Sequence, residues 1–371
     1  MAAVATGILG STCYFRFNIG NLNLNGKKKK STDLILQDRS LAARKQYHTS
    51  VFAQCFSPCG KFLAAANNHG SIAIFSLTTA LSPDSTEALW KPVYSFKASE
   101  EGAIFCLASS DIFLISGGNG PICAWKWSDI LNKSPKVIWS WAIPKKGPFY
   151  QTEVNTIVID KQETQCRLYA GCGDNNVYVW DLETGEQLVT LSGHDNYIHS
   201  VSLKNKGQMC ATASEDGTVK LWDMRHPSAA EHTLEPYKNQ LCARPEFGRW
   251  LGCVAMETGD DWLVCGGGPK MSLWHLRSLE ATTVFDTPAV CQKTVMFYED
   301  TIISAGGEPY VNHWYVNGDQ KSRIPCTPTN VFSVVVNTAL NSHKVLCTAG
   351  NRPKIDVCTN FGYKAFSLTF S

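Results

Sequence analysis

Three features that would narrow the function of this chain are missing from its sequence. No apolar run approaches the 18 or more residues of a membrane-spanning helix. The formal net charge at pH 7 is only +2, which excludes a nucleic-acid footprint over the whole surface and leaves only local basic patches. No Cys-x-x-Cys pair is present to begin a zinc site. We therefore expect neither a membrane span nor a metal site.

The cysteines do not form a recognisable disulfide framework. There are 15 of them, an odd number, and several fall inside apolar runs that are typical of strands, such as Cys106, Cys210 and Cys265. We interpret them as small core residues in a reducing compartment, the cytosol or the nucleus.

The first 46 residues differ in composition from the rest. Residues 1–33 include NIGNLNLNGKKKKST, which cannot bury enough apolar surface to offset the entropy of ordering, so we predict a flexible extension. The lysines at 27–30 indicate either a nuclear localisation or RNA-contacting patch, or an ordinary solvated tail. Residues 34–46 predict a short helix, and the main domain then spans 47–371.

A strand–turn–strand unit recurs seven times from Val51 onward. Each copy closes with an alternating apolar strand after a turn rich in Gly or Asn, and the closing strands follow one another at intervals of 40 to 55 residues, the period of propeller blades. They end at Phe75, Trp125, Trp180, Trp222, Trp274, Trp314 and Cys358. A single unit cannot bury both of its faces, so stacking around a ring is the physical solution. We predict an all-β fold, a seven-bladed β-propeller with four-stranded antiparallel blades.

The order of the strands also predicts how the ring closes. The first unit begins with its innermost strand at residues 51–56, and the last ends with its outermost strand at 365–370. No strand from one terminus is left to complete the blade at the other. We expect closure by packing between the first and last blades, with residues 34–46 as a candidate cover for the seam.

The most complete unit is GHDNYIHSVSLKNKGQMCATASEDGTVKLWDM, residues 193–224. Its Gly-His pair, hydroxyl, turn Asp and closing Trp-Asp resemble a repeat of the WD40 family. The resemblance implies a WD40-type propeller and a structural tetrad, a buried hydrogen-bond chain through His194, Thr212, Asp216 and Trp222. A catalytic His194–Asp216 pair is the functional alternative, but no nucleophile or third ligand accompanies it. We expect no catalytic, cofactor-binding or metal-binding residue and no enzymatic activity.

Two long loops, 144–152 and 237–250, each join one predicted blade to the next. Both mix basic and aromatic side chains, a composition typical of protein interfaces. The candidate partner-binding residues are Lys145, Lys146, Phe149, Tyr150, Arg244, Phe247, Arg249 and Trp250. The alternative is that the aromatic side chains pin these loops to the blades. A third insertion, 78–92, is mostly polar, and we expect a mobile loop there.

A closer resemblance rests on three stretches of sequence. They are SPCGKFLAAANNHGSIAIFSL, GRWLGCVAM followed by DDWLVCGGGPKMSLWHLRS, and the ending VCTNFGYKAFSLTFS. These stretches resemble the THO complex subunit 6 family of WD40-repeat proteins, and the likeness runs from about residue 47 to 371. The resemblance implies a non-enzymatic scaffold in the nucleus and its speckles, within the transcription-export assembly that couples mRNA processing and splicing to mRNA export. It also implies a hetero-oligomer in which the propeller docks coiled-coil subunits 5 and 7 and other subunits bind the RNA.

The residues after the fourth closing strand leave a second function open. Trp222, Asp223, Met224 and Arg225 form a WDxR box, which resembles the motif by which WD40 substrate receptors dock on the adaptor of cullin-RING ubiquitin ligases. Asp223 and Arg225 are the candidate docking residues, and the two functions do not exclude each other.

Overall fold

The computed structural model describes residues 40, 44–144, 152–161, 166–204, 207–259, 261–287, 291–339 and 344–370. The chain divides into two compact units, 1–44 and 45–371. Of the helix predicted over 34–46, Ser40 and residues 44–46 are helical, and the helix continues to Tyr47. The extension 1–33 and the remaining positions of that helix lie outside the described residues.

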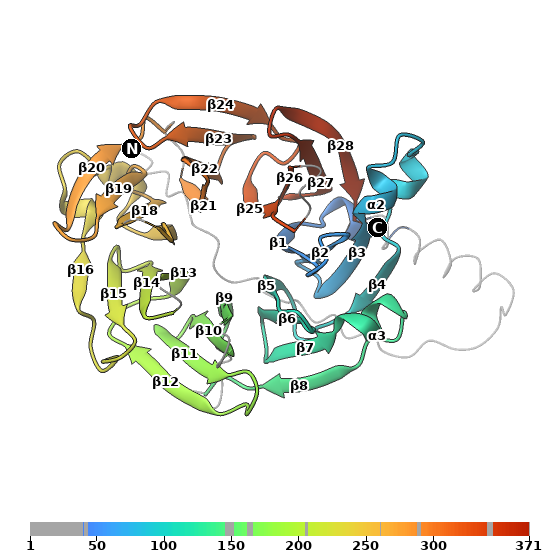
Figure 1. Cartoon of the computed structure of the whole chain (residues 1–371), viewed down its shortest axis with the longest axis horizontal. Coiled ribbons are helices and arrows are strands. Elements are labelled where there is room, and N and C mark those ends of the chain that lie inside the picture. The colour runs from blue at the N-terminus through green and yellow to red at the C-terminus, as the bar shows by residue number, and fades with distance from the viewer. Residues whose placement is uncertain are drawn as a thin grey trace, which may run out of the picture. The chain divides into compact units, whose positions relative to one another are not determined.

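Seven four-stranded antiparallel sheets are arranged as the blades of a propeller (Figure 1). The first blade contains β1 (Val51–Phe56), β2 (Phe62–Asn67), β3 (Ser71–Ser76) and β4 (Tyr94–Lys97), and the second contains β5 (Ile104–Ser109), β6 (Phe113–Gly118), β7 (Ile122–Lys126) and β8 (Val137–Trp141). The third contains β9 (Val154–Lys161), β10 (Cys166–Cys172), β11 (Asn176–Asp181) and β12 (Gln187–Ser192), and the fourth contains β13 (Ile198–Lys204), β14 (Met209–Ser214), β15 (Val219–Asp223) and β16 (His232–Leu234).

The remaining three blades follow the same order. The fifth contains β17 (Leu251–Met256), β18 (Trp262–Gly267), β19 (Ser272–His275) and β20 (Glu280–Val284), and the sixth contains β21 (Gln292–Tyr298), β22 (Thr301–Gly306), β23 (Tyr310–Tyr315) and β24 (Gln320–Pro325). The seventh contains β25 (Val331–Asn337), β26 (Val345–Gly350), β27 (Arg352–Thr359) and β28 (Tyr363–Thr369). Short helical turns lie between strands: α2 (Leu77–Ala80), η1 (Glu87–Trp90), α3 (Trp127–Leu131), η2 (Pro236–Lys238) and η3 (Pro245–Phe247). The predicted fold class is confirmed.

The first strand of each blade lies nearest the ring axis, and the fourth lies at the rim (Figure 1). The face on which each fourth strand leads into the first strand of the next blade is called the top face below. Buried apolar side chains gather between neighbouring sheets. Leu221 of β15 and Leu263 of β18, for example, belong to one cluster that joins the fourth and fifth blades. Each blade is therefore stabilised mainly by its two neighbours.

The ring closes without exchange of a strand, as the strand order predicts, because the first blade is built only from β1 to β4 and the seventh only from β25 to β28. One apolar cluster spans the seam and includes Phe75 of the first blade and Leu368 of the seventh. Within the described residues, two side-chain hydrogen bonds cross it: Gln54 Nε2 donates to the Ser333 carbonyl at 3.2 Å, and Asn337 Nδ2 donates to the Gly60 carbonyl at 2.8 Å. The suggested cover by residues 34–46 lies largely outside the described residues.

The insertion 78–92, for which the sequence suggests a mobile loop, contains regular structure. It folds into α2 and η1. The Trp90 ring stacks on Phe366 of the last blade, with ring centroids 5.1 Å apart and an interplanar angle of 14°, and its indole N–H donates to Ser85 Oγ at 3.1 Å. This partly buried aromatic side chain attaches an otherwise polar loop to the last blade.

The cysteines of the described residues are free thiols, and eight of them are buried. Burial raises the pKa of the Cys265 thiol to about 12, although a hydrogen bond with Ser272 opposes the shift. These eight cysteines behave as small core residues, as the sequence predicts. Within the described part of the chain, no helix has both the length and the apolar character needed to cross a membrane.

One residue departs from the pattern of the innermost strands. Six of these seven strands begin with a buried aliphatic residue, for example Val51 and Val331, whereas the sixth begins with Gln292, which is fully buried. Among the described residues, neither the amide nitrogen nor the amide oxygen of Gln292 has a hydrogen-bond partner. A buried amide without partners keeps its full cost of desolvation.

We expect Gln292→Met to stabilise the protein by about 1–3 kcal/mol, because methionine has the same length and needs no hydrogen bond. Urea denaturation of the two proteins measures the difference. Val331→Gln, the reverse change at the equivalent position of the next blade, is the control and should destabilise. A loss of stability in Gln292→Met would mean that the amide has partners in solution.

Candidate functional site

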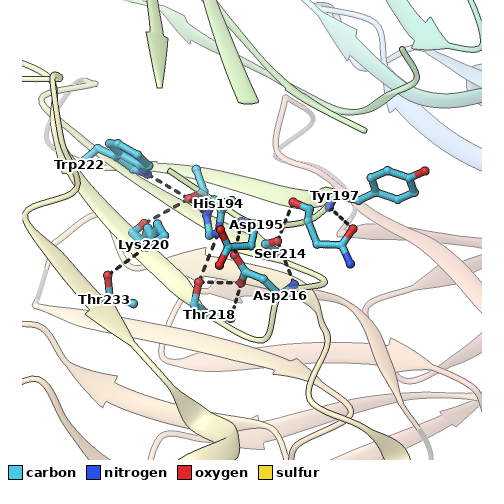
Figure 2. A network of polar contacts seen from close by, with 11 residues as sticks. His194, Asp195, Tyr197, Ser214, Asp216, Thr218, Lys220, Trp222 and Thr233 are labelled. Atoms are coloured by element: carbon cyan, nitrogen blue, oxygen red, sulfur yellow. Dashed lines mark hydrogen bonds and ion pairs between the residues drawn. The ribbon is translucent and has the colours of Figure 1, made fainter. Parts of the chain in front are cut away.

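The predicted tetrad forms a continuous hydrogen-bond chain in the fourth blade (Figure 2). His194 Nδ1 lies 2.7 Å from Asp216 Oδ2, and His194 Nε2 lies 2.7 Å from Thr212 Oγ1. The indole N–H of Trp222 donates to Thr212 Oγ1 at 3.0 Å. An imidazole protonated at Nδ1 satisfies every bond, because Nδ1 donates to the carboxylate while Nε2 accepts from the hydroxyl.

Further donors converge on the Asp216 carboxylate. It accepts from Thr218 Oγ1 at 2.7 Å and from the backbone N–H groups of Thr218 at 2.8 Å and Asp195 at 3.1 Å. Burial raises the pKa of Asp216, but hydrogen bonds from His194 and Thr218 outweigh it and hold the pKa well below its usual range. The carboxylate therefore stays charged at neutral pH and fixes the turn between β14 and β15 to the loop before β13.

Other blades keep only parts of this chain. In the sixth blade, the indole N–H of Trp314 donates to Ser304 Oγ at 3.0 Å. In the third, Tyr178 donates to Asp174 Oδ2 at 2.6 Å. The chain thus holds the fourth blade together, and the third and sixth blades keep a reduced form of it. The described residues contain no group of three or more His, Cys, Asp or Glu side chains placed to bind a metal ion.

Half of the candidate partner-binding residues can be placed. Lys145, Lys146, Phe149 and Tyr150 lie outside the described residues. The other four lie in the second loop, between β16 and β17 on the top face. The structure therefore describes the surroundings of the candidate residues in the second loop only.

Arg244 does not project toward a partner. It is 7% exposed, and its guanidinium donates to the carbonyls of Gly268 at 2.9 Å and Pro269 at 3.1 Å. It also lies over the Phe247 ring, 5.0 Å from the centroid. These hydrogen bonds attach the loop to the turn between β18 and β19, so Arg244 has a structural role. The sequence shows only a basic residue in a polar loop and does not predict this role.

The other residues of this loop differ in exposure. Trp250 is partly buried, and its indole N–H donates to the Phe247 carbonyl at 3.1 Å. Arg249 is exposed and lies over the Tyr237 ring, 5.9 Å from the centroid. Leu241 is 68% exposed. The accessible part of the loop therefore includes an exposed leucine and an exposed arginine beside a tyrosine ring, together with other exposed residues such as Lys238 and Glu246.

Asp223 and Arg225 lie at the end of β15, on the face opposite the top face. The Arg225 guanidinium donates to both carboxylate oxygens of Asp223, with Nη2 at 2.6 Å from Oδ2 and Nε at 2.9 Å from Oδ1. These bonds hold the pKa of Asp223 at about 2. The arginine is exposed but already paired within its own turn.

One feature of the top face was not predicted from the sequence. Each innermost strand carries a β-bulge at its second residue, where the pairing with the next strand skips one position. We call these seven residues the bulge ring: Phe52, Phe105, Asn155, His199, Gly252, Lys293 and Phe332. The distance from these residues to the closing residue differs from blade to blade, so aligning the units on their closing strands does not place them in one column, and only the pairing register reveals the bulge.

Comparison with known proteins agrees with this architecture. The family model "WD domain, G-beta repeat" matches residues 185–223, around the complete tetrad. The chain is 43% identical over 328 residues to the THO complex subunit 6 homolog of Danio rerio, covering 87% of this chain and 98% of that protein. It is 43% identical over 336 residues to THO complex subunit 6 of Homo sapiens, covering 90% and 96% of the two chains. The Drosophila melanogaster THO complex subunit 6 is 33% identical over 326 residues, covering 86% of this chain and 89% of that protein. Since the likeness extends over nearly the whole length of these relatives, the chain belongs to the THO complex subunit 6 family of WD40-repeat proteins.

Proposed function

We propose that this chain is a non-enzymatic scaffold subunit of a nuclear THO complex and supports mRNA processing and export by docking other proteins. The observation that carries the proposal is the full-length relation to proteins named THO complex subunit 6, which reaches 98% of the Danio rerio chain. A propeller held by blade-to-blade packing suits this role, because its faces can vary while the core stays fixed.

The proposed partners are the coiled-coil subunits 5 and 7 within a hetero-oligomer. The proposed contact is the loop 237–250 on the top face, through Leu241, Arg249 and the ring of Tyr237. Exposed aromatic, arginine and apolar side chains close together are the usual anchors of an interface. RNA contact is indirect in this proposal, because a net charge of +2 supplies little of the phosphate neutralisation that drives RNA binding.

Affinity purification of the tagged full chain from nuclei tests the assembly. Co-purification of the other THO subunits, with subunits 5 and 7 at near-equal amounts, is the expected result. Recovery of a cullin and its adaptor without THO subunits would refute the proposal and favour the ligase function of the WDxR box. In that event Arg225→Ala should abolish the recovery of the adaptor.

The docking surface is tested by the double variant Leu241→Ser/Arg249→Ala. We expect recovery of subunits 5 and 7 to fall about tenfold or more, as loss of anchor residues does. Stability should change by no more than about 0.5 kcal/mol, since both side chains are exposed. The matched control is Leu131→Ser/Lys126→Ala, two exposed residues around α3 on the opposite face, which should leave recovery unchanged. Equal recovery with both variants would place the contact elsewhere.

A further inference from the structure

The bulge ring gives the top face a set of side chains that belong to no blade-to-blade core. Phe52 lies between Val51, which packs in the cluster at the seam, and Ala53, which packs in the cluster between the first and second blades. The bulge allows Phe52 to join neither cluster, and it stays partly exposed. A bulge repeated at the second position of all seven strands re-aims the residue there in the same way in each blade, and Gly252 is the one member without a side chain.

Three neighbouring members form an apolar arc. The Phe52 ring lies 5.6 Å from the Phe105 ring and 5.2 Å from the Phe332 ring, measured between centroids. Phe52 belongs to the first blade, Phe105 to the second and Phe332 to the seventh, so the arc bridges the seam between the first and seventh blades. All three are partly exposed. Three adjoining, incompletely buried phenylalanines offer a platform for an apolar side chain.

Lys293 stands at one end of this arc. Its Nζ lies 4.8 Å from the centroid of the Phe332 ring. Burial lowers the pKa of Lys293, and Cys291 opposes this shift. Within the described residues, no carboxylate lies at ion-pair distance from its ammonium. A partly desolvated ammonium beside aromatic rings gains most from an incoming anion.

The next polar member of the ring is already paired. His199 Nε2 lies 3.4 Å from Glu215 Oε2. Burial lowers the pKa of His199, Glu215 opposes that shift, and the positive charge of Lys293 lowers it further. Among the residues that the structure describes, Lys293 is therefore the cation of the ring with no carboxylate at ion-pair distance.

We propose that the bulge ring binds a short peptide segment of a partner protein, with one acidic side chain at Lys293 and an adjacent apolar side chain on Phe332, Phe52 and Phe105. None of these four residues belongs to the loop 237–250, although the Trp250 ring of that loop lies 6.5 Å from the His199 ring of the bulge ring, between centroids. The bulge ring adds to the docking function a recognition site for an acidic–apolar motif.

Two other occupants fit less well. RNA binding needs several phosphates to be neutralised, whereas the ring offers one cation that has no ion pair with any described residue, next to three phenylalanines. The chain's own extension, 1–33, holds Lys27 to Lys30 and a single acidic residue, Asp33, so its charge opposes that of Lys293.

Panning a random dodecapeptide phage library on the full-length protein tests the proposal. We expect enrichment of peptides with Asp or Glu next to Leu, Ile, Met or Phe. The most enriched peptide is then synthesised with a fluorescent label, and its Kd is measured by anisotropy. Lys293→Met should weaken binding about tenfold or more, because it keeps the length of the side chain and removes the charge. Phe332→Ala should weaken binding to a similar extent.

Controls separate this site from a general surface effect. Lys126→Met, on the opposite face, should leave the Kd unchanged, and changing the acidic residue of the peptide to its amide should remove the difference between wild type and Lys293→Met. The melting temperature of Lys293→Met should equal or exceed that of wild type, since a desolvated charge is lost. The proposal would be overturned if the peptides bound wild type and Lys293→Met with the same Kd. It would also be overturned if a labelled U15 RNA bound more tightly than any peptide and lost affinity in Lys293→Met. Binding that appears only after removal of residues 1–39 would also overturn it, because the chain itself would then occupy the ring.

Discussion

Trp222→Ala is expected to destabilise the propeller by about 3–5 kcal/mol, as removal of a large core aromatic does. Trp222 is 1% exposed and packs in the cluster between the third and fourth blades. The substitution leaves a cavity between two blades and also takes the donor from Thr212 Oγ1. Urea denaturation followed by circular dichroism gives the free energy of unfolding.

The contribution of the hydrogen-bond chain can be separated from that of packing. Trp222→Phe keeps most of the apolar area but removes the indole N–H, and it should cost about 1–2 kcal/mol. Trp314→Phe is the matched control, because Trp314 is buried and donates to Ser304 in a blade that lacks the His and Asp partners. We expect the loss in the sixth blade to be the smaller of the two.

A double-mutant cycle decides whether the chain acts as a unit. Trp222 and Asp216 share no hydrogen bond with each other. The hydrogen-bond chain connects them through Thr212 and His194. If the chain is cooperative, Trp222→Phe and Asp216→Asn should show a coupling of about 0.5 kcal/mol or more. Trp314→Phe combined with Asp216→Asn should be additive, since the residues lie in different blades. Additivity in the first cycle would reduce the tetrad to independent bonds.

The sequence predicts the ring well because every blade repeats the same local pattern. Alternating strands, a Gly-rich or Asn-rich turn and a closing apolar strand can be counted even where the tetrad has decayed to Trp314 and Ser304. The closure of the ring follows from the same count. Such features depend on neighbours along the chain, so a single sequence contains them.

Arg244 and the bulge ring were not predictable in the same way. Arg244 has the composition of an interface residue, and only the turn between β18 and β19, brought near by folding, supplies the carbonyls that bind it. The bulge depends on the register between two strands, and one skipped residue leaves no mark in hydropathy. Sites built from one residue per blade therefore become visible only when the blades are superimposed in space.

Phe75→Ala tests whether packing alone closes the ring, and we expect a cost of about 3–5 kcal/mol. Phe75 is fully buried in the cluster that joins the first and seventh blades. No strand is shared across this seam, so a cavity there weakens the main attachment between the two blades. Native-state hydrogen exchange should show lower amide protection in β25 to β28 as well as in β1 to β4.

Phe285→Ala provides the comparison within the ring. Phe285 is also fully buried, in the cluster between the fifth and sixth blades, so its removal should cost a similar free energy. Its loss of protection should concentrate in those two blades and leave the seam less affected. If Phe75→Ala lowers protection in the first blade while the seventh stays as in wild type, the apolar cluster does not hold the seam. Closure would then rest on Gln54 and Asn337, whose side chains bond to Ser333 and Gly60 across it.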